Sequence, residues 1–184
     1  MKKTILNPIL IAVVLGVVTM AMLIAGFLIP WGTLMTDPRE IPLTLGAALT
    51  GPLGIVILAI FNFIGNLFSP LDAPISVFLA DALAHAAAML LFSIVYSKVI
   101  YKIKMPWRLV GWAAGIWVYY FVFMYPIGGI VFYWWLGMIP TPFYLFQNPP
   151  WAEIILTCIV TTLIMVALPK GYHRPVWYDE AKSK

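Results

Sequence analysis

The stretch 41–68 reads IPLTLGAALTGPLGIVILAIFNFIGNLF and contains no charged side chain over 28 residues. As one straight α-helix it would extend about 42 Å at about 1.5 Å per residue, whereas the hydrocarbon core of a bilayer is about 30 Å thick. Pro52 lacks a backbone N–H and clashes with the preceding turn, so a helix should break or kink at this point. The stretch therefore represents one membrane crossing or two, and charges elsewhere in the chain decide between them.

The composition indicates an integral membrane protein. Hydrophobic residues make up 63% of the 184 residues and charged residues 10%, whereas soluble domains average about 45–50% and about 25%. The single cysteine, Cys158, lies in an apolar run, which excludes a disulfide framework or a cysteine metal cluster. The net charge of +4 comes from lysines and arginines beside apolar stretches, so membrane topology explains it better than nucleic-acid binding does.

The apolar stretches predict an all-α protein, a single compact bundle of six transmembrane helices. The predicted spans are about 8–29, 41–51, 53–68, 75–99, 108–127 and 151–168, followed by a cytoplasmic tail, 169–184. The first run is longer than the core of a signal peptide, so we interpret it as a retained span. The fifth span should end near Pro126, and 130–150 is too rich in aromatics and prolines to read as a regular helix.

Positive charges are retained on the cytoplasmic side of a membrane. If Lys2, Lys3 and the basic loop 98–108 all lie inside, the stretch 41–68 must cross an even number of times. Two crossings leave ten of the eleven Lys and Arg residues inside and only Arg39 outside. The prediction is a multi-pass plasma-membrane protein with both termini in the cytoplasm. A re-entrant hairpin over 41–68 satisfies the same count.

With this orientation, polar side chains of four spans fall in the outer leaflet. Two asparagines lie one turn apart in the third span, and an aspartate and a histidine lie one turn apart in the fourth. We predict that they line a pocket open to the outside, together with residues of the last two spans and of the loop 31–40. The predicted substrate-binding residues are Asn62, Asn66, Asp81, His85, Tyr119, Phe123, Glu153, Thr157, Trp31 and Arg39.

The same residues have other interpretations. An ionisable group inside a span costs about 2.5–3.5 kcal/mol on insertion scales, so it should face a cavity or a partner. Asp81 and His85 could simply pair with each other or with the asparagines and fasten the bundle. A metal is less favoured, because no second histidine lies in any span. Glu153 could be a first-turn residue favoured by the helix dipole.

Motifs for catalysis and for nucleotide binding are missing. The sequence contains no G-x-x-x-x-G-K-[ST] loop, no G-x-S-x-G elbow and no H-E-x-x-H helix. We therefore expect neither an enzyme nor a cofactor, and transport driven by hydrolysis would need other subunits.

The segment 47–54, AALTGPLG, joins a short apolar run to a longer one within 42–66. A small six-span chain with this feature resembles the substrate-binding S component of energy-coupling factor (ECF) vitamin transporters. The resemblance implies an outward-facing pocket lined by spans four to six and the first extracellular loop. It also implies a membrane coupling protein and two ATPase subunits as partners. Docking to them would use small residues of the first span, for which Ala12 and Gly16 are the candidates.

Charge narrows the expected substrate. No Lys or Arg lies inside a span away from the basic loop 98–108, so an anion would find no buried cationic partner except Arg39 from the loop. Acidic and aromatic residues suit a neutral or cationic heterocycle, for example thiamine, its pyrimidine precursor or a deazapurine. Two other classes stay open: an accessory subunit of a larger membrane complex, and a self-sufficient channel or carrier. The latter would need polar residues in the inner leaflet, where the spans offer almost none.

Overall fold

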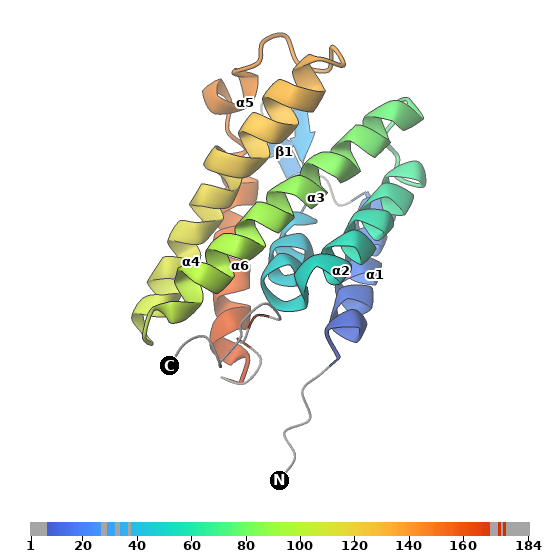
Figure 1. Ribbon diagram of the computed structural model, residues 1–184. Coiled ribbons are helices and arrows are strands. Elements are labelled where there is room, and N and C mark those ends of the chain that lie inside the picture. Colours follow the sequence, from blue (N-terminus) through green and yellow to red (C-terminus); the bar gives the residue numbers. More distant parts are fainter. Residues whose placement is uncertain are drawn as a thin grey trace.

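The computed structural model describes residues 7–26, 29–31, 34–36, 38–169, 173 and 175 (Figure 1). Its helices are α1 Pro8–Ile24, α2 Glu40–Leu67, α3 Ile75–Lys98, α4 Trp107–Val118, α5 Tyr144–Gln147 and α6 Trp151–Ala167. A 3-10 turn, η1 Ile100–Lys102, follows α3, and a π-helix, η2 Tyr119–Trp134, continues α4. Two short antiparallel strands, β1 Ile29–Trp31 and β2 Leu34–Thr36, join α1 to α2.

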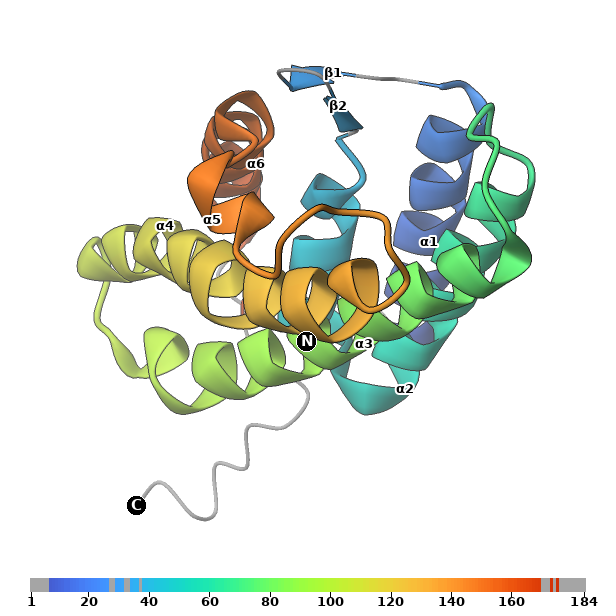
Figure 2. The same ribbon diagram turned by 90° about the horizontal axis from the view of Figure 1, so that it is seen from above.

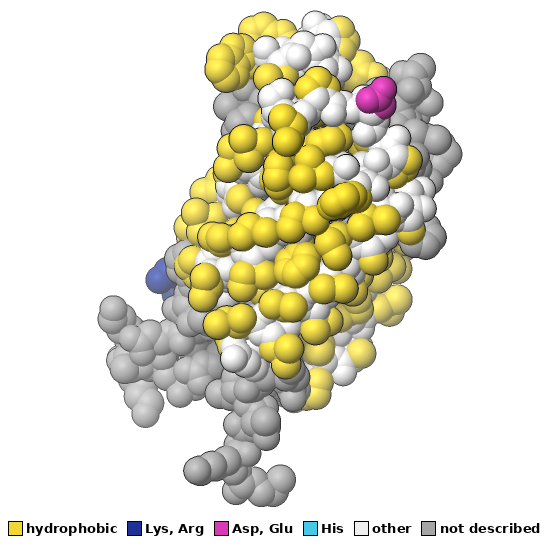
Figure 3. Space-filling model, turned by 90° about the vertical axis from the view of Figure 1, so that its right-hand side faces the viewer, with side chains coloured by type: hydrophobic (Ala, Val, Ile, Leu, Met, Phe, Trp, Pro, Cys, Tyr) yellow, Lys and Arg dark blue, Asp and Glu magenta, His cyan; other side chains and the backbone are white. Residues whose placement is uncertain are grey.

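Within the described residues the regular structure is helical apart from this hairpin, and three of the described helices are long and apolar enough to cross a membrane. They are Glu40–Leu67, Ile75–Lys102 and Trp107–Ile130, and α1 and α6 are shorter apolar helices of 17 residues each. Hydrophobic side chains cover most of the face seen in Figure 3, whereas an acidic side chain lies near its upper end and a basic one at its lower edge. These features are typical of a protein surrounded by lipid.

The helix α2 reverses direction at Gly51, where φ is 70° and ψ is −170°. Glycine adopts a positive φ without the steric penalty that a Cβ would bring, and Pro52 begins the second arm with no N–H to leave unsatisfied. A Cβ on Gly46 would collide with the side chain of Leu58, although the two positions would lie about 18 Å apart in a straight helix. The predicted break is thus a hairpin of two arms, which Figure 1 shows as a descending and an ascending segment.

The helix α1 packs in parallel along the second arm of α2. Ala12 lies beside Gly54, since a Cβ added to Gly54 would be 3.2 Å from the Ala12 Cβ, and a Cβ on Gly16 would collide with Phe61. Farther along, a Cβ on Gly65 would lie 3.0 Å from the Cα of Met20. Close helix approach of this kind is what small residues permit in membranes.

This packing corrects the interpretation of Ala12 and Gly16 as a docking surface. Ala12 is 0% exposed and Gly16 is buried, because both face α2. The exposed side of α1 carries larger apolar residues such as Leu10 and Val14 instead. The small-residue pattern in this helix therefore serves contacts inside the chain.

The helix continues past Pro126, the residue near which we predicted the fifth span to end. The chain stays helical from Trp107 to Trp134, because α4 passes directly into the 16-residue π-helix η2. Pro126 lies within this π-helix and does not end it. Long π-helices are unusual, and shorter ones are frequent at functional sites. The first span is shorter than predicted, since α1 ends at Ile24.

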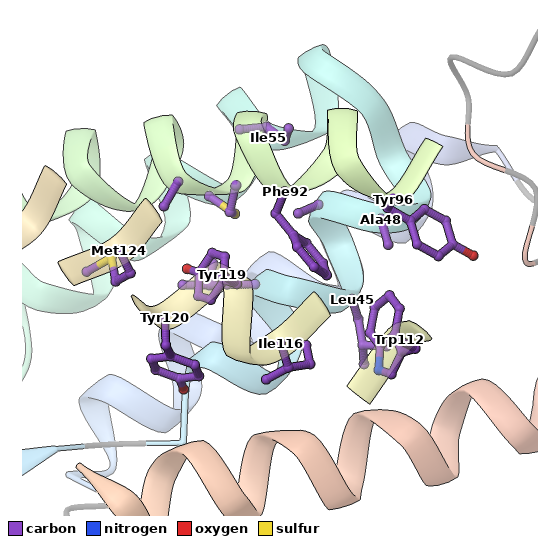
Figure 4. Packing of buried hydrophobic residues seen from close by; sticks show 14 of the residues in the cluster. Leu45, Ala48, Ile55, Phe92, Tyr96, Trp112, Ile116, Tyr119, Tyr120 and Met124 are labelled. Atoms are coloured by element: carbon purple, nitrogen blue, oxygen red, sulfur yellow. The ribbon is translucent and has the colours of Figure 1, made fainter. Parts of the chain in front are cut away.

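The first arm of α2 occupies the centre of the bundle, between α1 and α6 (Figure 2). All residues of 42–51 are buried. Leu45 and Ala48 pack with aromatic side chains of α3 and α4, as Figure 4 shows. Phe92 contacts both Trp112 and Tyr119 edge to face, with ring centroids 5.6 Å apart in each pair. Such contacts hold the first arm of α2 in place, and this arm begins at Glu40, in the polar site.

Candidate functional site

Buried polar residues gather at one end of the bundle, which we call the polar end. Both ends of α2 lie there because the helix folds back at Gly51, and α3 and α6 begin there while η2 ends there (Figure 1). The residues that hydrogen-bond to one another at this end are named the polar cluster. It consists of Arg39, Glu40, Asn62, Asn66, Asp81, His85, Tyr119 and Tyr133.

Asp81 on α3 is the centre of one half of this cluster. Its carboxylate accepts a forked pair of hydrogen bonds from the Arg39 guanidinium, Nη1 to Oδ2 at 2.8 Å and Nη2 to Oδ1 at 3.2 Å. The side-chain amides of Asn62 and Asn66 donate to Oδ2 at 3.1 and 2.8 Å. Tyr133 donates its phenol proton to Oδ1 at 2.6 Å. Every donor of this set converges on a single buried carboxylate.

The two asparagines bind the guanidinium as well as the carboxylate. Their side-chain oxygens accept from Arg39 Nη1 at 3.2 Å for Asn62 and 3.1 Å for Asn66. They lie one turn apart, so their side chains project from one face of the second arm of α2. Each amide therefore uses its oxygen for the cation and its nitrogen for the anion of the same ion pair.

The second half of the polar cluster is built around Glu40 and His85. His85 Nε2 lies 2.6 Å from Glu40 Oε1, and the other glutamate oxygen accepts from the Tyr119 hydroxyl at 2.7 Å. His85 Nδ1 lies 2.7 Å from the backbone oxygen of Asp81. Both ring nitrogens face acceptors, and only an imidazolium donates from both. The charges of the polar cluster then balance as two ion pairs.

Sequence spacing sets the order of these two ion pairs. Arg39 and Glu40 are consecutive residues, whereas Asp81 and His85 lie one helical turn apart on α3. Arg39 therefore pairs with Asp81, and Glu40 pairs with His85. The start of α2 is thereby fastened to α3.

A smaller polar contact lies beside the polar cluster, at the start of α6. The Tyr120 hydroxyl donates to Glu153 Oε1 at 2.7 Å and lies 3.2 Å from the hydroxyl oxygen of Thr157. Tyr119 and Tyr120 are neighbours in η2, with ring centroids 5.4 Å apart. The two carboxylates, Glu40 and Glu153, are thus each bonded to one of two adjacent tyrosines.

Most of the predicted site residues come together. Six of them belong to the polar cluster and two to the neighbouring contact at α6: Arg39, Asn62, Asn66, Asp81, His85 and Tyr119, then Glu153 and Thr157. Phe123 is half-buried and packs against the hydrophobic core instead. The side chain of Trp31 lies outside the described part of the structure, although its backbone forms the end of β1.

Three residues of the site were missed from the sequence. Glu40 was assigned to a loop, whereas it is the first residue of α2 and is 3% exposed. Tyr133 lies beyond the predicted end of its span, and Tyr120 was not separated from the neighbouring aromatic residues. An acidic residue directly before a long apolar run is a recognisable helix-start signal that could have identified Glu40.

Among the residues that the structure describes, no three His, Cys, Asp or Glu side chains are grouped so that they could hold a metal ion. The acceptors of the site instead bind N–H and O–H donors.

Comparisons with known proteins found no match for this chain among family models, curated proteins or solved structures.

Proposed function

We propose that this chain is the substrate-binding subunit of an ECF-type importer for a small vitamin-like solute in the plasma membrane. In this proposal the two arms of α2 are two of six spans, and both ends of the chain lie in the cytoplasm. The polar end then lies in the outer half of the membrane, where a solute enters. A membrane coupling protein and two ATPase subunits supply the energy.

The observation that carries the proposal is the burial of charged and amide side chains at one end of an apolar bundle. Asp81, His85 and Glu40 are 6%, 1% and 3% exposed, although each costs free energy to place within a bilayer. Such groups inside a membrane mark a ligand or ion site by default. The aromatic residues around them, including Tyr119 and Tyr133, suit a flat heterocycle.

The opposite end supports the orientation. Lys98 ends α3 there and is exposed, as are Lys102 and Lys104 after it, and excess positive charge in short loops marks the cytoplasmic side. The described spans have no buried charged side chain in that half of the bundle. A self-sufficient channel, which would need a continuous polar path, is therefore less favoured. A binding subunit that works with other proteins is favoured instead.

The proposal is tested by two measurements on the purified full-length chain. A thermal-shift screen against vitamins and their precursors should give saturable stabilisation by one neutral or cationic heterocycle. Expression with the coupling protein and ATPase pair of an ECF module from the same source should yield a complex that survives size exclusion. A chain that no vitamin stabilises and that binds no ATPase pair would refute the proposal.

One observation favours a second candidate, an accessory subunit of a membrane complex. Asp81 already accepts five hydrogen bonds from residues of this chain, so the cluster can serve to fasten helices together. In that case Asp81→Asn impairs assembly but changes no small-molecule binding. In the importer it abolishes the stabilisation by the solute.

A further inference from the structure

We infer that Asp81, Asn62 and Asn66 form a binding site for the cationic group of an organic ligand, and that Arg39 fills this site until the ligand displaces it. The three residues are named the cation cradle. The inference rests on the proposed function and narrows its substrate to a planar cation with forked N–H donors, such as an amidinium or a guanidinium.

The contacts of Arg39 define which chemical group the cation cradle selects. One face of the site is a carboxylate whose two oxygens receive two parallel N–H bonds, the arrangement that matches a planar fork. The other face consists of two amide oxygens, both bonded to the same guanidinium nitrogen, Nη1. Four acceptor atoms thus surround one end of a planar cation. An ammonium group lacks the rigid planar fork that places two parallel N–H bonds on the two carboxylate oxygens.

The residues of the cation cradle lie in helices, whereas Arg39, which occupies it, lies in the turn before α2. Asn62 and Asn66 lie in the second arm of α2 and Asp81 lies in α3, and the three are between 0% and 6% exposed. Their amides also bond to Asp81 at 3.1 and 2.8 Å, which holds the acceptor oxygens in place whether or not a cation is present. A site held in this way is organised for binding before its ligand arrives.

Arg39 enters the cation cradle from the turn before α2, on a long flexible side chain. Its side chain keeps 15% of its surface exposed, compared with 8% for that of Asp81. An empty cradle would leave Asp81 as a buried, uncompensated carboxylate, which is strongly unfavourable. A resident guanidinium avoids that cost, and a ligand with the same donors can replace it at the more exposed side.

These contacts predict which ligands the cation cradle accepts and which it rejects. An anion cannot bind the cradle, because it would meet the Asp81 carboxylate. A neutral amide of the same shape offers one N–H₂ group and one acceptor oxygen, and that oxygen would oppose a carboxylate or amide oxygen. Amidinium and amide compounds of equal size, such as acetamidinium and acetamide, are therefore matched probes.

The first experiment removes the resident cation. In Arg39→Ala the cradle is open, and acetamidinium should raise the thermal midpoint of the purified chain by about 3–6 °C at ten times its Kd. Acetamide should give no saturable shift, and the wild type should need a much higher acetamidinium concentration than the variant. Arg108→Ala is the matched control, because this arginine lies over the ring of Tyr101 at the other end of the bundle.

Arg39→Lys covers the case in which Arg39→Ala does not fold. Lysine keeps a positive charge near Asp81 but cannot form the fork, so the same shift is expected at a higher acetamidinium concentration. Adding Asp81→Asn to either variant should abolish the response. Equal responses to acetamidinium and acetamide in a folded variant would overturn the inference, and so would equal responses of wild type and variant.

The second experiment tests whether Arg39 competes with the ligand for the cation cradle or binds the ligand itself. Benzamidine and benzamide are the probes, because the aromatic ring adds stacking to the same matched pair of groups. If Arg39 occupies the cation cradle, Arg39→Lys should bind benzamidine more tightly than wild type, on the order of tenfold. The reason is that the open, binding-competent cradle is then populated more often. Weaker binding by Arg39→Lys would overturn the inference.

The two proposals fail in different ways. Stabilisation of the wild type by an anionic vitamin, lost in Arg39→Lys, would leave the importer in place but make Arg39 a ligand-binding residue. Absence of any vitamin effect and of any ATPase partner would refute the importer, whereas the response of Arg39→Ala to acetamidinium would still report the cradle.

Discussion

The two ends of the bundle solve the same problem, a buried polar group, in different ways. At the polar end, Asp81 and Glu40 are paired with cations and phenols. At the opposite end the described structure has a buried hydrogen bond between two neutral groups, from the Tyr96 hydroxyl to the backbone oxygen of His173 at 2.7 Å. Neutral hydrogen bonds fasten helices at little risk, whereas buried charges are costly unless every partner is present. We therefore expect substitutions of buried groups to cost more stability at the polar end than at the opposite end.

The largest effect is expected from Asp81→Ala. Removing this carboxylate leaves the Arg39 guanidinium without its anion and should lower the free energy of unfolding by about 3–5 kcal/mol. Thermal or denaturant unfolding in detergent measures the change. Asp72→Ala is the matched control, because Asp72 is exposed in the loop between α2 and α3 and its loss should change stability by at most about 0.5 kcal/mol. Equal effects of the two variants would remove the distinction between buried and exposed carboxylates.

The next effect concerns a tyrosine at the polar end. Tyr119→Phe removes the hydroxyl that donates to Glu40 at 2.7 Å, and hydrogen bonds to charged groups contribute about 1.5–3 kcal/mol. The free energy of unfolding should fall by that amount. In a double-mutant cycle with Glu40→Gln, the two losses should be smaller together than their sum, because they share one contact. Additive losses would mean that the two side chains act independently.

A third variant tests the hairpin that brings both ends of α2 to the polar end. Gly46→Ala places a methyl group against Leu58, and overpacking of this kind costs about 1–3 kcal/mol. Leu58→Val shortens the opposing side chain, so the double variant should recover part of the loss. If Gly46→Ala is neutral and Leu58→Val gives no recovery, the two arms do not pack as described.

The smallest effect is expected at the opposite end. Tyr96→Phe removes a neutral hydrogen bond to the backbone of His173 and should lower the free energy of unfolding by about 0.5–1.5 kcal/mol. Because it is the same substitution as Tyr119→Phe, the ratio of the two losses compares the ends directly. A larger loss for Tyr96→Phe than for Tyr119→Phe would reverse the comparison.

Much of the fold follows from simple rules on the sequence. The apolar composition predicts the membrane class, and Gly51-Pro52 predicts the break in α2, which the structure confirms as a reversal. The one-turn spacing of Asn62 with Asn66, and of Asp81 with His85, predicts two polar faces. These predictions depend on local chain geometry, which sequence encodes directly.

Other features depend on contacts between distant segments and could not be predicted. Proline ends most helices, yet Pro126 lies within η2, and this extension brings Tyr133 to Asp81. The small residues Ala12 and Gly16 are compatible with an internal or an external partner, and only the packing of α1 on α2 decides between them. Likewise, the sequence identifies Arg39 only as a cation in a loop, and the ion pair with Asp81 is known only from the fold.

The hairpin in α2 also constrains how this chain can vary. Its first arm, from Glu40 to the turn, works as a spacer whose length sets where Arg39 and Glu40 arrive relative to Asn62 and Asn66. Deleting one residue from this arm would shift its start by about 1.5 Å and rotate it by about 100° around the helix axis. Both ion pairs would then lose their partners together. Substitutions in the arm can be absorbed by repacking, but a change in its residue count cannot.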